Sequence, residues 1–400
     1  MTKGKIICLY FKNDYISIKM IATKPERKSC VKFLQEQSKE LGAKCQVVEC
    51  SPGNPAVIMT VTGHQTCLSL LFVVTHILLR KIIVEHWKYE PFSAHKDESG
   101  NIFGRGTQDM KCVGIQYLEA LKQLATEGKI FRRTIHLTFV PEEELGGRLG
   151  MGELVKTKCF KEMNVGFALD EGYANPTEKF SVFYSQRSPW WVLLSCPGQP
   201  GHGSQFLPNN AGVKLQKVIN SFMNFRKSEL QRLKTNPSLN LGDVTTVNLT
   251  MLEGGVQFNV VPAELKVGFD IRLAPTVNQE EFEAMIQQWC RDAGDGITYE
   301  CLQKVKSQPI TCTENGKSAW WDAFSRGCKE HNVELVKEVF PASTDLKYIR
   351  TLGIPALGFS PMNNTPILLH DHNEFLNENI FLKGIDIYKT IITELANVKA

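Results

Sequence analysis

Five residues of metal-binding type are spaced along the chain, each at or near the end of a segment with the pattern of a strand: His76, Asp109, Glu144, Glu171 and His370. Two imidazoles and three carboxylates suit a pair of zinc-like divalent ions, provided that one carboxylate bridges the two. Glu143 stands beside Glu144, where its carboxylate could take a proton from water. The pattern predicts a two-metal hydrolase.

Each residue also has an ordinary structural interpretation when it is taken alone. The acidic triplet 142–144 could be a solvated loop, and an Asp at the start of a helix is usually an N-cap. A histidine in an apolar strand is usually a core residue, Glu171 could be a turn acid, and His370 or His372 could be a loop histidine. Joint placement at strand ends favours the metal site. If 143 and 144 are extended, their side chains point to opposite sides, so one can bind metal while the other faces its water.

The surrounding segments alternate between strands and helices. Helices are predicted at 29–41, 110–128, 320–328 and 381–396, and strands at 45–50, 56–61, 67–79, 134–140, 165–169 and 354–359. This order predicts a mixed α/β fold with a mostly parallel sheet, whose ligand sites gather at the carboxyl ends of the strands.

The pattern changes in the middle of the chain. Strands at 189–195, 245–253, 260–273 and 297–303 alternate with helices at 210–233 and 278–293. Their β-α-β-β-α-β order is that of a ferredoxin-like α+β domain. We therefore expect a discontinuous catalytic domain, residues 1–187 and 304–400, with an inserted domain at 188–303.

Composition excludes several classes of function. Lys and Arg number 46 against 42 Asp and Glu, which gives a net charge of +4, too balanced for nucleic acid or an anionic membrane as the main partner. Twelve scattered cysteines without a CxxC pair fit a reduced, cytoplasmic protein. The N-terminal segment lacks the apolar core of a signal peptide, and the longest apolar run, 67–79, is shorter than the roughly 20 residues of a membrane span. Neither GxSxG nor GxGxxG occurs.

Longer motifs resemble those of the M20 family of metallopeptidases: GRGTQDMKC, TFVPEEELGG, GFALDEG, SPWW, GHGS, FNVVPAEL, FDIRLAP, STDLKYIR and LLHDHNE. The resemblance extends from about residue 12 to the C-terminus. It implies a zinc-peptidase-like catalytic domain, an inserted dimerisation or lid domain, and a homodimer with two zinc ions per subunit. The expected reaction is hydrolysis of N-acyl-L-amino acids such as N-acetyl-methionine to a free amino acid and a carboxylate.

The resemblance also implies a role for each matching residue. His76 and Glu171 would hold one zinc, Glu144 and His370 the other, and Asp109 would bridge the two. Glu143 matches the general base. His202 matches a histidine that reaches across the dimer interface to polarise the scissile carbonyl. The residues that match substrate-binding positions are Asn259, Arg272, Thr344, Asp345 and Lys347.

The sequence departs from the family pattern near His76. The family has His-x-Asp-x-Val-Pro, whereas this chain has Leu78 in place of the Asp that orients the histidine. Such a loss typically costs about 10–100-fold in metal affinity or activity. The substitution leaves two alternatives to an ordinary amidohydrolase. The chain could be a weakened or inactive paralogue that only binds ligands, or the sequence could contain an error confined to 68–83. A dipeptidase of the same family is a further alternative.

Overall fold

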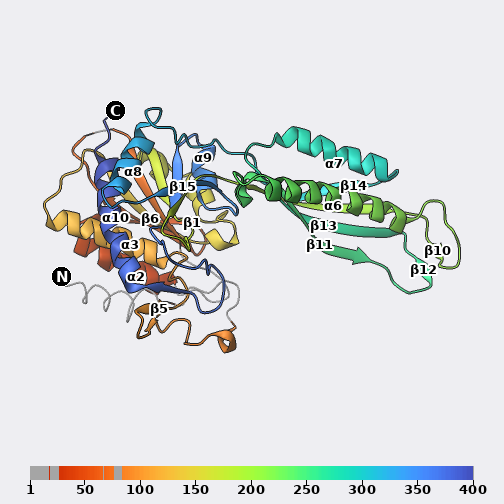
Figure 1. The fold of residues 1–400 in the computed structure, drawn as a ribbon, viewed down its shortest axis with the longest axis horizontal. Coiled ribbons are helices and arrows are strands. Elements are labelled where there is room, and N and C mark those ends of the chain that lie inside the picture. The colour runs from red at the N-terminus through yellow and green to blue at the C-terminus, as the bar shows by residue number, and fades with distance from the viewer. Residues whose placement is uncertain (1–17, 19–26, 66, 76–82, 400) are drawn as a thin grey trace. The chain divides into compact units, whose positions relative to one another are not determined.

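The computed structural model describes residues 18, 27–65, 67–75 and 83–399. The chain forms two compact units. Unit 1 comprises Met1–Tyr184, Pro309–Glu338 and Thr344–Ala400, and unit 2 comprises Ser185–Gln308 and Val339–Ser343. Figure 1 shows the elements of each unit.

An eight-stranded sheet forms the centre of unit 1, in the order β1-β2-β6-β3-β7-β16-β8-β15. Its strands are β1 (Lys44–Ser51), β2 (Asn54–Val61), β3 (Ser69–Thr75), β6 (Ile135–Val140), β7 (Val165–Asp170), β8 (Phe180–Gln186), β15 (Leu335–Phe340) and β16 (Ala356–Phe359). The four central strands, β6, β3, β7 and β16, run parallel, while β1, β2 and β8 pair in antiparallel fashion. This confirms the predicted α/β fold with parallel central pairs.

Helices and short strands complete unit 1. They are α2 (Arg27–Leu41), α3 (Lys111–Thr126), α4 (Met151–Leu154), α5 (Lys158–Glu162), α8 (Ala319–Lys329), α9 (Leu346–Thr351) and α10 (Glu378–Ala396), with the 3₁₀ turns η1 (Val84–His86) and η2 (Glu143–Leu145). A small separate sheet joins β17 (Phe375–Asn377), β5 (Asn101–Phe103) and β4 (His95–Lys96).

Strand β3 shows how the sheet is covered on both faces. Leu70, Phe72 and Val74 belong to a core with residues of α2, α3, α8 and α10. Figure 1 shows α2, α3 and α10 beside one another. Leu71 and Val73 alternate with them and pack on the opposite face with residues of α4, α5 and α9. Burial on both faces explains the continuous apolar run, since neighbouring strand residues point to opposite sides.

Unit 2 has the predicted β-α-β-β-α-β order. Its elements are β9 (Ser188–Pro197), α6 (Ala211–Thr235), η3 (Leu241–Asp243), β11 (Thr246–Gly254), β13 (Glu264–Leu273), α7 (Gln279–Ala293) and β14 (Thr298–Lys304). All pairs in the sheet, β11-β13-β9-β14, are antiparallel, as in a ferredoxin-like fold. Alternate residues of β9, from Trp190 to Cys196, pack with the inner faces of α6 and α7.

The single strand predicted at 260–273 is wrong. The structure has β12 (Val260–Val261), paired with β10 (Gly201–His202), and then the separate strand β13. Pro262 lies between them, and because proline lacks a backbone N–H it interrupts a ladder of strand hydrogen bonds.

Candidate metal centre

The carboxyl ends of three neighbouring parallel strands define the site. Strand β6 leads directly to the turn η2 with Glu143 and Glu144, and β7 is followed at once by Glu171. Strand β3 lies between them and ends at Thr75. His76 and Leu78 follow in the sequence and lie outside the described residues. Parallel strands end at one edge of a sheet, so this order gathers their following residues.

The extended conformation predicted for Glu143 and Glu144 is wrong, because both lie in the 3₁₀ turn η2. The preceding Glu142 has a φ of 70°, and its carbonyl oxygen accepts a hydrogen bond from the N–H of Gly147 at 2.8 Å. The Glu142 carboxylate accepts a further bond from the N–H of Leu149 at 2.5 Å. The directions of the Glu143 and Glu144 side chains therefore differ because of the rotation of a tight turn, and not because of the alternation of residues along a strand.

Three of the predicted ligands converge here. Nε2 of His370 lies 3.1 Å from Oδ2 of Asp109 and 2.9 Å from Oε2 of Glu144. One possible ligand atom from each of the three lies within 4.8 Å of the others. Glu171 joins the group through a hydrogen bond between its carboxyl group and that of Asp109. Asp109 thus contacts His370 on one side and Glu171 on another.

Asp109 does not cap the helix that follows it. Helix α3 begins at Lys111, its N-cap position is Met110, and no side chain caps it. The Asp109 carboxylate is directed to His370 and Glu171 instead. The usual structural role of an Asp before a helix therefore does not explain this residue.

Burial dominates the electrostatics of the carboxylates. Burial raises the pKa of Glu143 well above its usual range, and the charges of Glu144 and Asp345 raise it further. Burial, followed by the charge of Asp109, likewise raises the pKa of Glu144 and of Glu171. Clustered carboxylates are costly in a protein interior unless a positive charge compensates them.

The histidine supplies part of that compensation. Burial alone would raise the pKa of Asp109, but hydrogen bonds with His370 and Glu171 outweigh it and lower that pKa. Hydrogen bonds with Asp109 and then with Glu144 raise the pKa of His370 to about 10. A divalent cation would satisfy the same oxygen atoms, because carboxylate oxygens and imidazole nitrogens are ligands that zinc takes in proteins. The donor set fits such an ion.

The three residues predicted in the STDLKYIR segment lie in unit 1 beside this group. Thr344, Asp345 and Lys347 are all buried. Thr344 forms a side-chain hydrogen bond with Asp170, the residue before Glu171. The charges of Asp345 and Lys347 both act on Glu143, in opposite directions. Burial raises the pKa of Asp345 to about 7, opposed by the charge of Lys347.

The remaining predicted residues belong to unit 2. His202 is exposed on β10, and its Nδ1 lies 2.8 Å from the hydroxyl of Ser204. Asn259 lies on the facing segment, where its carbonyl oxygen accepts a bond from the N–H of Gly203. Arg272 forms a two-point ion pair with Asp270, with N···O distances of 2.7 and 2.9 Å.

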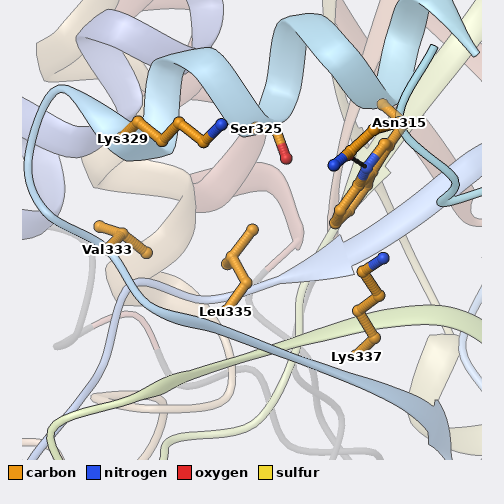
Figure 2. Close-up of a pocket in the computed structure, with 7 residues that line it drawn as sticks. Asn315, Ser325, Lys329, Val333, Leu335 and Lys337 are labelled. Atoms are coloured by element: carbon orange, nitrogen blue, oxygen red, sulfur yellow. Dashed lines mark hydrogen bonds between the residues drawn. The ribbon is translucent and has the colours of Figure 1, made fainter.

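Figure 2 shows a pocket of about 190 Å³ between α8 and β15. Ser325 and Lys329 project from the helix and Leu335 and Lys337 from the strand, and Asn315, Trp321 and Val333 complete the lining. Nε1 of Trp321 donates to Oδ1 of Asn315 at 2.9 Å. None of the predicted site residues that the structure describes lines this pocket, which is therefore distinct from the group of Asp109, Glu144 and His370.

Sequence reasoning missed three residues that hold the site together. Arg105, Gln108 and Glu374 are buried and connect the segments that carry Asp109 and His370. A signal existed in the sequence, because Arg105 and Gln108 lie within GRGTQDMKC and Glu374 ends LLHDHNE.

Comparisons with known proteins show the family and the fold of the chain. The model of Peptidase family M20/M25/M40 matches residues 83–394. Aminoacylase-1B of Rattus norvegicus and Aminoacylase-1 of Homo sapiens are 51% and 50% identical over 387 residues, covering 97% of this chain and 95% of each relative. The structure of an M20 family metallo-carboxypeptidase from Sulfolobus solfataricus has the same fold, with a TM-score of 0.73, 16% identity and 99% of both chains covered.

The chain belongs to the M20 family of peptidases, and it is a hydrolase. Members of this class are metal-dependent, in keeping with the group formed by Asp109, Glu144 and His370. Among the described residues, no helix has both the length and the apolar character needed to cross a membrane.

Proposed function

We propose that this protein is a dinuclear zinc amidohydrolase that cleaves N-acyl-L-amino acids, such as N-acetyl-methionine, to a free amino acid and a carboxylate. The observation that carries the proposal is the convergence of Asp109, Glu144 and His370 beside the carboxyl ends of β6 and β7. Identity of about 50% to aminoacylases over nearly the whole chain supports the same substrate class.

The metal ligands divide into two sets that share one carboxylate. His370 and Glu144 would hold one ion, His76 and Glu171 the other, and Asp109 would bridge them. The contacts of Asp109 with His370 and with Glu171 support this division. When bound, divalent ions at this place supply Lewis acidity toward water and an acyl carbonyl.

Glu143 carries the proton in the proposed reaction. Its carboxylate takes a proton from the water that attacks the acyl carbon, and later delivers a proton to the nitrogen of the leaving amine. Water first adds to the acyl carbon to form the C–O bond, and the C–N bond of the resulting tetrahedral species then breaks to release the amine, so no covalent enzyme intermediate is needed. Burial and neighbouring charges that raise the pKa of Glu143 favour a group that can hold this proton.

Cationic and polar groups would recognise the rest of the substrate. Lys347 and Arg272 offer positive charge for the free α-carboxylate, and Thr344, Asp345 and Asn259 complete the substrate-binding set. A lysine is a point charge, whereas an arginine presents a two-point fork, so recognition at position 347 depends on distance more than on angle. His202, which is exposed, would polarise the scissile carbonyl from the partner subunit of a homodimer.

Unit 2 is the proposed dimerisation domain. It exposes Phe206, Val256 and Phe258 almost fully, and Leu252 by 60%. Large apolar side chains exposed together are typical of protein interaction surfaces. The eleven cysteines among the described residues are all free, which supports a reducing compartment such as the cytoplasm.

The test is hydrolysis of N-acetyl-L-methionine by the zinc-loaded protein, compared with the dipeptide glycyl-L-methionine. We expect the acetylated substrate to have the higher kcat/KM, by at least about tenfold, which corresponds to about 1.4 kcal/mol. Preference for the dipeptide would instead establish a dipeptidase, and folded, zinc-loaded protein without turnover on either would overturn the proposal.

The alternatives raised by Leu78 are not favoured by the comparisons, because the closely similar curated relatives are aminoacylases. The substitution Leu78→Asp separates them experimentally. A weakened enzyme gains about 10–100-fold in activity or metal affinity when the family's Asp is restored. Sequencing the transcript across 68–83 tests the sequence-error explanation, and a confirmed leucine codon at position 78 rules out an error there.

A further inference from the structure

Two loops from distant parts of the chain carry metal ligands, and neither is part of a helix or strand. The Asp109 loop comprises residues 104–109, and the His370 loop comprises residues 366–374, which lead directly into β17. His370 and Asn373 have φ angles of 60° and 58°, in the left-handed region that few non-glycine residues occupy. Contacts with the rest of the chain would restrain this conformation.

Glu374 provides the first part of that restraint. Its side chain is fully buried, and it crosses from the His370 loop to the backbone of the Asp109 loop. Oε1 accepts hydrogen bonds from the N–H groups of Gly106 at 3.1 Å, Gln108 at 2.7 Å and Asp109 at 3.2 Å. One carboxylate thus fixes three backbone amides, including that of the proposed bridging ligand.

Arg105 balances the buried charge of Glu374, and it reaches from the Asp109 loop to the backbone of the His370 loop. Its Nη1 lies 2.8 Å from Oε2 of Glu374, in an ion pair that is almost completely buried. Its Nη2 donates to the carbonyl oxygen of Asp371 at 2.9 Å, which lies next to His370. The guanidinium group also stacks over the ring of Trp87, 5.0 Å from its centroid.

Gln108 completes the connection from the Asp109 loop. Its Nε2 donates to the carbonyl oxygens of Pro366 at 3.0 Å and Phe375 at 2.8 Å. Its Oε1 accepts from the N–H of Leu368 at 3.0 Å. These three bonds hold the His370 loop before and after the ligand.

We propose that Glu374, Arg105 and Gln108 form a reciprocal clamp that sets the distance between Asp109 and His370 and so determines metal affinity. The inference rests on the proposed function, because it assumes that these two residues bind the ion. All three members are positioning residues, since they bond to backbone next to the ligands. Each loop supplies side chains that bond to the backbone of the other loop, so the two loops hold their geometry together.

The chain offers a matched control for Gln108. Gln116 is also fully buried, and its Nε2 donates to a backbone carbonyl oxygen, that of Phe381, at 3.0 Å. It lies within α3, away from both loops. Gln108→Leu removes three hydrogen bonds and Gln116→Leu removes one, both at nearly constant volume, but only the first substitution acts on the clamp.

The experiment measures two properties of the full-length protein besides turnover. Competition with a chelator gives the Zn²⁺ dissociation constant, and hydrogen exchange of the metal-free protein reports the amides of Gly106, Gln108 and Asp109. We expect Gln108→Leu and Glu374→Gln to weaken Zn²⁺ binding about 10–100-fold and to speed exchange of these amides. Gln116→Leu should lower the melting temperature and leave the Zn²⁺ affinity within about threefold of the wild type.

Arg105→Lys serves as a milder variant in case Glu374→Gln does not fold. It keeps a cation beside Glu374 and loses the bond to Asp371, so we expect a smaller loss of Zn²⁺ affinity. Folded Gln108→Leu and Glu374→Gln proteins with wild-type affinity and protection would overturn the clamp, as would equal weakening by Gln116→Leu. Wild-type protein that binds Zn²⁺ without hydrolysing the acyl substrate would refute the proposed function and leave this comparison intact.

Discussion

Nε2 of His370 lies 3.1 Å from Oδ2 of Asp109, although the two residues lie far apart in the sequence. The same nitrogen contacts Glu144, so a single imidazole joins carboxylates from two further segments. His372, two positions on, contacts His86 instead.

Loss of His370 should reduce metal binding selectively. We expect His370→Ala to lose about one of the two proposed zinc ions per chain, because Asp109 and Glu144 alone leave that ion with too few protein ligands. Metal analysis after dialysis measures the change. His372→Ala is the matched control, since it removes a nearby imidazole whose contact is with His86. Loss of zinc from the control with retention in His370→Ala would reverse the assignment.

Glu143 should affect turnover and not metal content. We expect Glu143→Gln to lower kcat by about 10²–10⁴-fold, the usual contribution of general acid–base catalysis, while zinc content stays unchanged. The neighbouring Glu142→Gln changes a carboxylate of the same triplet that instead accepts the N–H of Leu149. Steady-state kinetics of the two variants separate the roles, and a larger loss of kcat in the Glu142 variant would contradict the assignment to Glu143.

His136 should make the stability of the fold depend on pH. Burial lowers the pKa of this imidazole to about 4, whereas in the unfolded chain it is about 6.5. Between these values the unfolded state binds a proton that the folded state does not, so stability is full above pH 6.5 and falls as the pH decreases toward 4. The loss approaches about 3 kcal/mol.

Urea unfolding of the wild type and His136→Gln across this pH range measures the effect. Glutamine retains hydrogen-bonding capacity toward Thr60, which the imidazole contacts at 3.1 Å, but it does not titrate. The variant should therefore show a shallower decline between pH 6.5 and 4. Parallel curves for the two proteins would refute the role of His136.

Gly327 should not tolerate a side chain although it lies inside helix α8. A Cβ atom there would lie 2.7 Å from Cα and 2.8 Å from the backbone nitrogen of Ile391 in α10. Alanine improves helix propensity by about 1 kcal/mol, but forced separation of packed helices typically costs about 1–3 kcal/mol. We expect Gly327→Ala to lower the free energy of unfolding on balance.

Chemical denaturation tests this balance, with Ser325→Ala as the control in the same helix. Ser325 borders the pocket in Figure 2 and is only partly buried. Its substitution should change stability by no more than about 0.5 kcal/mol. A stabilised Gly327→Ala protein would show that the two helices can separate without cost.

Elements with strong periodic patterns were predicted closely from the sequence. The helix expected at 381–396 is observed as Glu378–Ala396, and the strand expected at 134–140 as Ile135–Val140. Strands β8 and β15 and the short helix α9 were not anticipated. Their sequences are short and mix apolar and polar residues, so they give no clear periodic signal.

The sequence by itself determined the types of residue at the site and the strands that precede them. Residue chemistry and the position of each strand along the chain are local properties of the sequence. Only the tertiary structure decided that Glu143 and Glu144 lie in a turn and that Glu374, Arg105 and Gln108 bond across two loops. These contacts join residues more than 250 positions apart, and they form because buried polar groups must find partners that folding brings to them.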